Sequence, residues 1–407
     1  MYRVTAYNFI FRRGLINKKE KIIMFKSEDF IKTQGNYTAE EIIQQPQMWL
    51  ETVHIIEKKL PEIAAFMERW NIADSRICIT GAGSSGYCAE MLAAAINMYL
   101  GSRAEAPHTT DIVGSPESAL GNSLLCDNIP TLLISLGRSG NSPESIGAVE
   151  YARKKVKNLY EICVTCAKDG ELCKISAESE KILKIVLPEK TCDRGFAMTS
   201  SFTSMALAVY GIFSYKNFAD FKNNVSVLAS LISAKLDDLC KIAQKAISEK
   251  NFDRMAFLGA GLLKGIARES SVKMSELSAG GVNVVRDTPL GFRHGPKSMI
   301  NDRTFIFHIV SGDSLTRKYD IDLLNELIAQ KQNYKIIAVT GMPLGIDGVD
   351  YEVAFDTNFA NDFYFAVAGI VFSQVFAFYK SQKMGITTDD PCPSGELNRV
   401  VKGVTIY

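Results

Sequence analysis

The chain has 407 residues, with 46 basic and 45 acidic side chains, and 47% of its residues are hydrophobic. The near balance of charge argues against a bulk nucleic-acid or membrane-surface partner, and no apolar run reaches the roughly 18 residues of a membrane helix. The length predicts about two globular domains, each able to bury its own core.

The N-terminal region divides into two parts. Residues 1–26 are expected to form a disordered extension, because FIFRRGLINKKEKII is basic and lacks the apolar core and cleavage site of a secretory signal. Residues 27–75 predict a helical segment. Trp49, Val53 and Ile56 recur there at helical spacing, and Thr38-Ala39-Glu40-Glu41 has the pattern of a capping box. The apolar face of this segment should pack against the next domain or a second subunit.

Strands and helices alternate in the next block, which predicts a first domain over residues 76–215. The expected strands are 76–80, 130–136, 159–165 and 181–187, and the expected helices are 87–100, 143–155 and about 199–213. Such alternation implies a parallel sheet that is covered by helices on both faces.

The pattern then repeats. A connecting helix is expected over 216–250, a second domain over 251–384, and a C-terminal tail over 385–407. The second domain is expected to hold strands at 254–259, 304–310, 335–340 and 352–356, and helices at 262–278, 320–331 and 361–384. A strand, a Gly-Ala-Gly turn and a helix occur in both halves. The sequence therefore predicts an α/β protein with two tandem, doubly wound parallel-sheet domains.

Two turns in the first half could bind a phosphate. One follows a strand with Ser84 and Ser85, and the other follows the next long strand with Arg138, Ser139 and Ser142. In a strand–turn–helix unit, backbone N–H groups and the positive end of the helix converge on one point, and hydroxyls add donors. Both turns are expected at the carboxyl ends of their strands, where ligands bind in doubly wound sheets.

A dinucleotide is the competing ligand, because GAGSSG fits the loose GxGxxG pattern. However, no acidic residue closes a clear second strand about twenty residues further on, as a ribose contact would require. The paired serines favour a sugar monophosphate. A turn that merely packs remains the alternative for GAGSSG.

Four ionisable residues in one region form a candidate acid/base set. Glu269, Lys273 and Glu276 fall at i, i+4 and i+7, on one face of the helix at 262–278, and His294 follows in a His-Gly-Pro turn. Alone, such a face is more often a solvated Glu–Lys pair. The phosphate turns that precede it give it a substrate to act on.

The cysteines give no sign of a metal centre or an oxidising compartment. Nine are scattered along a chain without a secretory signal, which favours a reduced, cytoplasmic protein. Cys163 and Cys166 form a CxxC, but zinc would need a second tight pair. We expect neither a metal nor a cofactor.

Several motifs, in order, resemble a known family. The stretches GAGSSGY, LISLGRSGNSPES, FLGAGLLKGIARESSVKMSELS, GFRHGPKSMI and ELNRVVKGVTIY resemble sugar isomerase (SIS) domains and the isomerase half of glucosamine-6-phosphate synthase. SGNSPES, FAMTSSFTSM and EEIIQQPQMW resemble the agaS-type proteins, which are described as tagatose-6-phosphate ketose/aldose isomerases or galactosamine-6-phosphate deaminases. The resemblance covers most of residues 76–407 and implies flavodoxin-like SIS domains.

The resemblance also implies roles for individual residues. Glu276 matches the base that moves a proton between C1 and C2, and Lys273 and Glu269 match its companions. His294 matches a ring-opening histidine that the neighbouring subunit lends, which implies a homodimer or homotetramer with a shared site. Lys402 matches the tail lysine that closes over the sugar. The two serine turns match the family's phosphate-binding turns.

There are departures from the synthase pattern. Gly137 stands where the second turn usually begins with serine, a loss that Arg138 is expected to offset in part. The chain has Tyr2 in place of a cysteine after the first Met and no glutaminase domain, so glutamine is not expected as nitrogen donor.

The expected function is therefore an amino-sugar phosphate deaminase/isomerase, acting on galactosamine 6-phosphate to give tagatose 6-phosphate and ammonia. A simple aldose–ketose isomerase and a non-catalytic sugar-phosphate sensor are the alternatives. Sugar-phosphate sensors of this type usually carry a helical DNA-binding domain. Residues 27–75 are too few and too evenly charged for such a domain.

Overall fold

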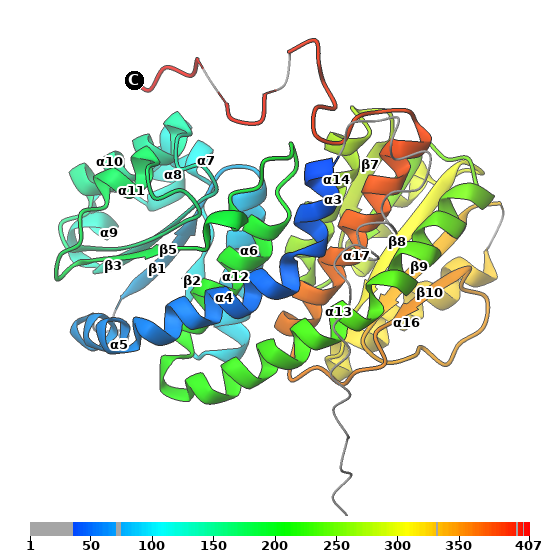
Figure 1. Ribbon diagram of the computed structural model, residues 1–407, viewed down its shortest axis with the longest axis horizontal. Helices are drawn as coiled ribbons and strands as arrows, with labels where there is room; N and C mark the ends of the chain where they lie inside the picture. The colour runs from blue at the N-terminus through cyan, green and yellow to red at the C-terminus, as the bar shows by residue number, and fades with distance from the viewer. Residues whose placement is uncertain (1–35, 71–74, 331–332, 396–397, 402) are drawn as a thin grey trace, which may run out of the picture.

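The computed structural model describes residues 36–70, 75–330, 333–395, 398–401 and 403–407. The predicted extension over residues 1–26 lies outside these ranges. Three helices open the described chain: α3 (Asn36–Ile43), α4 (Gln45–Lys58) and α5 (Leu60–Arg69). Figure 1 shows them running from the edge of the first half, at α5, to the middle of the molecule, where α3 packs beside α17 (Asp362–Lys383).

The N-terminal helices are held to the core by a few specific contacts. The indole nitrogen of Trp49 donates to the hydroxyl of Thr203 at 2.8 Å, deep in the interior. The predicted capping box is wrong, because α3 begins at Asn36 and Thr38 already lies inside it. The backbone N–H and hydroxyl of Thr38 instead donate to Asp389 at 2.8 and 2.7 Å, which joins this helix to the C-terminal region.

The first half contains a five-stranded parallel sheet in the order β2-β1-β3-β4-β5. Its strands are β1 (Arg76–Thr80), β2 (Ala104–Glu105), β3 (Thr131–Gly137), β4 (Leu159–Thr165) and β5 (Ile182–Val186). Its helices are α6 (Ser84–Tyr99), α7 (Thr109–Gly114), α8 (Pro116–Leu120), α9 (Ser123–Asn128), α10 (Pro143–Lys155), α11 (Glu171–Ile175), η1 (Glu189–Thr191) and α12 (Ser200–Phe213). Every residue of β3 is buried, as expected for a central strand with helices on both faces.

After η2 (Tyr215–Asn217) and the long α13 (Phe218–Glu249), the second half repeats this plan, with a parallel sheet in the order β10-β9-β8-β6-β7. Its strands are β6 (Arg254–Leu258), β7 (Asn283–Asp287), β8 (Thr304–Val310), β9 (Lys335–Thr340) and β10 (Tyr351–Ala354). Its helices are α14 (Leu263–Leu277), α15 (Pro289–Phe292), η3 (Pro296–Met299), α16 (Ser314–Ala329) and α17 (Asp362–Lys383). Counted within each half, the strand order is the same, 2-1-3-4-5, which confirms two tandem doubly wound domains.

Some elements differ from the prediction. The edge strands β2 and β7 and several short helices were not predicted; β2 has only two residues, too few to give an alternating pattern. Helix α16 begins at Ser314 rather than near residue 320, because the carboxylate of Asp313 caps it by accepting from the N–H groups of Leu315 and Thr316.

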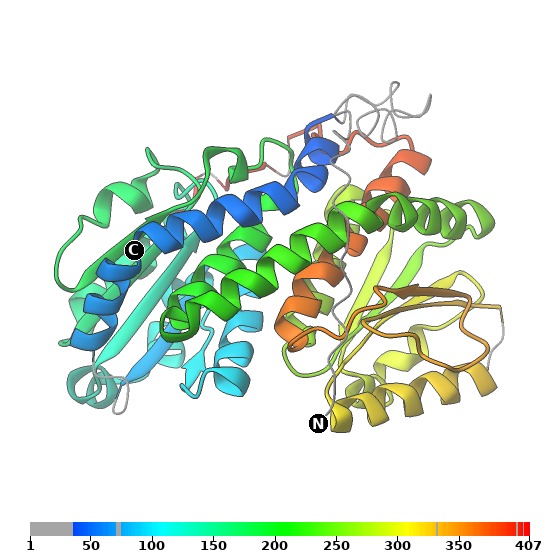
Figure 2. The same cartoon turned by 60° about the horizontal axis from the view of Figure 1, so that its bottom comes forward.

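The core joins both halves. One cluster of buried side chains includes residues of both sheets, and Figures 1 and 2 show α12, α13 and α17 running between them. Helix α17 has the length and apolar composition of a membrane span, yet its most apolar stretch is wholly buried inside the protein. Such burial is typical of a core helix.

Candidate active site

A pocket of about 210 Å³ opens at the carboxyl ends of β1 and β3, where the strand order reverses. Doubly wound sheets bind their ligands at such a switch point. The lining comes from both Gly/Ser turns, from Phe196 and Met198 ahead of α12, from Glu276 on α14, and from residues 398–401 of the tail. Both halves of the chain therefore build this pocket.

The first turn requires glycine to bring α6 close to β1. Gly83 has φ +56°, and a Cβ on Gly81 would lie only 2.5 Å from the Cβ of Ser85. The helix then starts at Ser84, and both serines are buried in the pocket wall. The hydroxyl of Ser84 accepts a hydrogen bond from the ammonium of Lys273 at 3.1 Å.

The second turn has the features of an anion site. Ser142 is the N-cap of α10, and Ser139 and Ser142 both line the pocket. The hydroxyl of Ser139 accepts from the N–H of Asn141 at 3.3 Å, and that of Ser142 donates to Glu144 at 3.4 Å. Hydroxyls beside a helix N-terminus suit a phosphate oxygen.

Arg138 also lines the pocket, but its guanidinium is engaged with the backbone. It donates to the carbonyls of Gly195 at 3.5 Å, Phe196 at 3.1 Å and Arg399 at 2.8 Å. Arg138 thus joins the β3 turn to the segment before α12 and to the C-terminal tail. The sequence interpretation had assigned these donors to phosphate.

The charged face of α14 points into the protein rather than to solvent. The ammonium of Lys273 lies 2.6 Å from Glu276 and 3.3 Å from Glu269, and both Lys273 and Glu269 are wholly buried. Burial acts to lower the pKa of Lys273, but the two carboxylates outweigh it and hold this pKa above its ordinary value. Lys273 is therefore a buried ammonium whose charged form the two carboxylates favour.

The two glutamates occupy different environments. Burial raises the pKa of Glu269 to about 7, against the opposing effect of Lys273. The side chain of Glu276 is 25% exposed and lines the pocket. Glu276 can therefore meet a substrate, whereas Glu269 is wholly buried behind the pocket wall.

Two predicted residues are not placed in this pocket. His294 is exposed in the turn between α15 and η3, outside the lining that this chain provides. Lys402 lies outside the described residues. Conversely, the sequence interpretation did not single out Asn398, Arg399 or the pair Val400 and Val401, which line the pocket. Their position inside the tail motif ELNRVVKGVTIY, directly before Lys402, was the available signal.

The CxxC pair is buried. Burial raises the pKa of the Cys163 thiol to about 12, which disfavours the thiolate that zinc requires. Among the residues that the structure describes, no group of three or more potential metal ligands comes together.

The comparisons with known proteins agree with this geometry. Residues 72–214 match the family model of the SIS domain. The chain is 36% identical over 388 residues to the D-galactosamine-6-phosphate deaminase AgaS of Shewanella sp. (strain ANA-3), with 95% of each chain covered. The crystal structure of tagatose-6-phosphate ketose/aldose isomerase from Escherichia coli has a TM-score of 0.82 and 34% identity, over 91% of this chain and 96% of that one.

A more distant structure shares the fold alone. The C-terminal domain of glucosamine-fructose-6-phosphate aminotransferase from Francisella tularensis has a TM-score of 0.72 at 19% identity, over 87% of this chain and 98% of that one. The two sheets and the pocket at the strand switch point define a protein of the SIS class. Within it, the identity along nearly the whole length shows that the chain belongs to the AgaS family.

Proposed function

We propose that this protein is an amino-sugar phosphate deaminase/isomerase that converts D-galactosamine 6-phosphate and water to D-tagatose 6-phosphate and ammonia. One observation carries the proposal: Ser84 contacts Lys273, and Lys273 contacts Glu276, so the phosphate turns and a carboxylate base share one pocket. The names of the AgaS relatives supply the sugar.

The pocket suits a substrate held by its phosphate. We place the phosphate at Ser139, Ser142 and the N-terminus of α10, and the C1–C2 end of the sugar toward Glu276. Binding of the phosphate holds the reacting carbon beside the base, so the proton transfer proceeds as an intramolecular step.

Proton transfer is the central step. After ring opening, Glu276 removes the proton from C2 and returns it to C1, which converts the 2-amino aldehyde into a 2-imino alcohol. Water then adds to the imine, and ammonia leaves to give the ketose. The ammonium of Lys273, 2.6 Å from Glu276, orients the base and stabilises negative charge on the enolamine. Glu269 is assigned the role of positioning Lys273.

Ring opening requires a second acid/base group. We assign it to His294, which is exposed and stands apart from the pocket of its own chain, so that it would enter the pocket of a neighbouring subunit. The enzyme would then be a homodimer or homotetramer. Lys402, on the tail that lines the pocket, is assigned to the closing of the site over the sugar.

The remaining assignments concern organisation. We propose SIS domains over residues 76–215 and 251–384, a helical segment over 27–75, a connecting helix over 216–250, and a closing tail over 385–407, with residues 1–26 as an extension. We also propose a reducing, cytoplasmic location, which fits seven buried cysteine side chains out of nine.

The test is an assay that measures ammonia and ketose separately, with galactosamine 6-phosphate and glucosamine 6-phosphate as substrates. We expect both products from galactosamine 6-phosphate, and a loss of about a thousandfold in turnover for Glu276→Gln. The control is Glu150→Gln, an exposed carboxylate on α10, which should keep full activity.

The outcome separates the candidate functions. Ketose without ammonia, from a sugar phosphate that carries no amine, would support a simple isomerase, the activity named for the Escherichia coli structure. Tight binding of the amino-sugar phosphates without either product would refute both enzymatic proposals and leave a sensor.

A further inference from the structure

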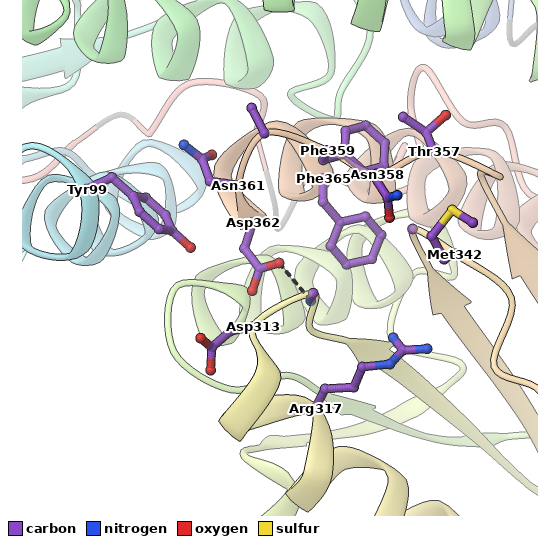
Figure 3. Close-up of a pocket in the computed structure, with 13 residues that line it drawn as sticks. Tyr99, Asp313, Arg317, Met342, Thr357, Asn358, Phe359, Asn361, Asp362 and Phe365 are labelled. Atoms are coloured by element: carbon purple, nitrogen blue, oxygen red, sulfur yellow. Dashed lines mark hydrogen bonds between the residues drawn. The ribbon is translucent and has the colours of Figure 1, made fainter. Parts of the chain in front are cut away.

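The second half contains a pocket that matches the first in part, one strand further along the sheet: β8 and β9 correspond to β3 and β4, whereas the first pocket lies at β1 and β3. It is larger, about 380 Å³, and lies at the carboxyl ends of β8 and β9. Phe359 and Asn361 precede α17 just as Phe196 and Met198 precede α12. The last turn of α6 contributes Tyr99, as the last turn of α14 contributes Glu276 to the first pocket. Figure 3 shows these walls.

The phosphate position of this second pocket is already filled by the protein itself. The carboxylate of Asp362, on the first residue of α17, accepts from the N–H of Gly312 at 2.8 Å and from the hydroxyl of Ser311. These groups follow β8 as the phosphate turn follows β3 in the first half. A phosphate would meet a buried carboxylate there, so this pocket excludes the ligand that we place in the first one.

One end of the pocket is acidic. The carboxylates of Asp313 and Asp362 are both in the lining, and Figure 3 shows Tyr99 directing its hydroxyl toward the same end. Burial, with Asp362 and Asp313 nearby, raises the pKa of Tyr99 to about 12, so this group stays a neutral hydroxyl. Asp313 uses one oxygen, Oδ1, for its cap of α16.

The other end carries hydrogen-bonding and apolar groups. Arg317 donates from Nη1 to the carbonyl of Ser311 at 3.3 Å and to the hydroxyl of Thr340 at 3.2 Å. Figure 3 shows its guanidinium at the side of the pocket where Met342 and Asn358 lie. Phe359 and Phe365 add two aromatic rings. With two carboxylates against one guanidinium, the lining as a whole is negative.

We propose that this pocket is a second, non-catalytic sugar site that binds an unphosphorylated hexosamine in its ammonium form. The amine lies at Asp313 and Asp362, ring hydroxyls bond to Arg317 and Asn358, and the apolar face of the sugar packs on the phenylalanine rings. The volume lies within the range of small-molecule sites. This site is distinct from the proposed active site, and its occupation requires no turnover.

Titration calorimetry on the full-length Glu276→Gln protein tests the proposal, with the first pocket saturated by galactosamine 6-phosphate. We expect galactosamine to bind at one site per chain and at least about tenfold more tightly than galactose, because galactose lacks the charged amine. Asp313→Asn should weaken galactosamine about tenfold, whereas Asp347→Asn, an exposed carboxylate elsewhere in the second half, should leave it unchanged.

A second variant guards against a folding artefact. Met342 is 42% exposed at the pocket, so Met342→Trp should fill the cavity without disturbing the core and should abolish galactosamine binding. The proposal is overturned if galactosamine gives no saturable heat, or if more galactosamine 6-phosphate competes it away, which would place it in the first pocket. It is also overturned if galactose binds equally well, or if neither variant weakens the binding of galactosamine.

Discussion

At the residue scale, Lys273 organises the active-site pocket. A wholly buried ammonium is costly unless opposite charges surround it, and here two carboxylates lie at 2.6 and 3.3 Å. The same ammonium contacts Ser84, whose turn begins the phosphate site. Lys273 therefore joins the carboxylate of Glu276 to the first turn.

Removing this ammonium should destabilise the protein strongly. In Lys273→Met, Glu269 stays buried without its counter-charge, so we expect a loss of about 3–5 kcal/mol in the free energy of unfolding at pH 8, measured by urea denaturation. The loss should be smaller at pH 5, where Glu269 is protonated. The double variant Lys273→Met/Glu269→Gln should recover part of the stability, and equal or greater instability of the double variant would contradict this account.

Glu41 gives a second prediction at this scale. Burial, with the neighbouring Asp193 and Asp389 carboxylates, raises its pKa to about 8, against bonds from the N–H groups of Arg194 and Gly195. Since the folded pKa exceeds the unfolded value of 4.5, the folded state binds the extra proton between about pH 4.5 and 8. The contribution of Glu41 to the free energy of unfolding therefore falls as the pH rises through that window.

Glu41→Gln removes this titration while its amide oxygen can still accept both backbone bonds. We expect the melting temperature of Glu41→Gln, relative to wild type, to rise steadily from pH 5 to pH 8. Glu40→Gln, its exposed neighbour on α3, should show a flat difference over the same range. A flat difference for Glu41→Gln as well would show that Glu41 has an ordinary pKa.

At the scale of elements, the segment between η1 and α12 forms one wall of the active-site pocket and is hydrogen-bonded to several distant parts of the chain. Asp193 caps α12 by accepting from the N–H groups of Thr199, Ser200 and Ser201. The β3 turn reaches the same segment through Arg138, α3 reaches it through Glu41, and the tail reaches it through Arg399. Four parts of the chain therefore meet at one side of the pocket.

Arg138 is the link that connects this wall to the tail. Arg138→Met loses the bonds to Phe196 and Arg399, so the tail should be less well held over the pocket. We expect the KM for the sugar phosphate to rise about tenfold with a smaller change in kcat, and trypsin to cut faster after Arg399. Arg153→Met on α10 loses bonds to Glu161 and to the carbonyl of Ile175, neither of which is in the tail, and should change neither measurement.

At the scale of the whole molecule, two copies of one fold have taken different roles. The first supplies phosphate turns, and the second supplies the charged helix that completes the same pocket. In the second copy, the carboxylate of Asp362 occupies the position that corresponds to the phosphate site of the first. Duplication thus leaves one phosphate site and one pocket of different charge.

Shared sites between subunits lead to a complementation test. Glu276→Gln and His294→Ala should each be nearly inactive as pure proteins. If each pocket takes His294 from its neighbour, mixed reciprocal dimers hold one intact pocket, and an equal mixture should regain about a quarter of wild-type activity. Activity that stays near zero after verified subunit exchange would place His294 in its own chain's pocket, and full activity of pure His294→Ala would place it outside catalysis.

The sequence by itself determined the class of fold, the tandem repeat and the family. Hydrophobic strands, glycine turns and amphipathic helices are set by neighbouring residues, so β3, α10 and α14 could be predicted within a few positions. The phosphate turns and the set of Glu269, Lys273 and Glu276 were visible for the same reason.

Only the tertiary structure decided which of these groups are buried and what they contact. The spacing of Glu269, Lys273 and Glu276 is equally typical of a solvated helix face, and burial follows from the contact with Ser84, 189 residues away in the chain. The hydrogen bonds of Arg138 with the tail and of Asp362 with the β8 turn likewise join residues that are far apart in the chain. Local patterns set the elements, whereas the charge and access of a site depend on which elements pack together.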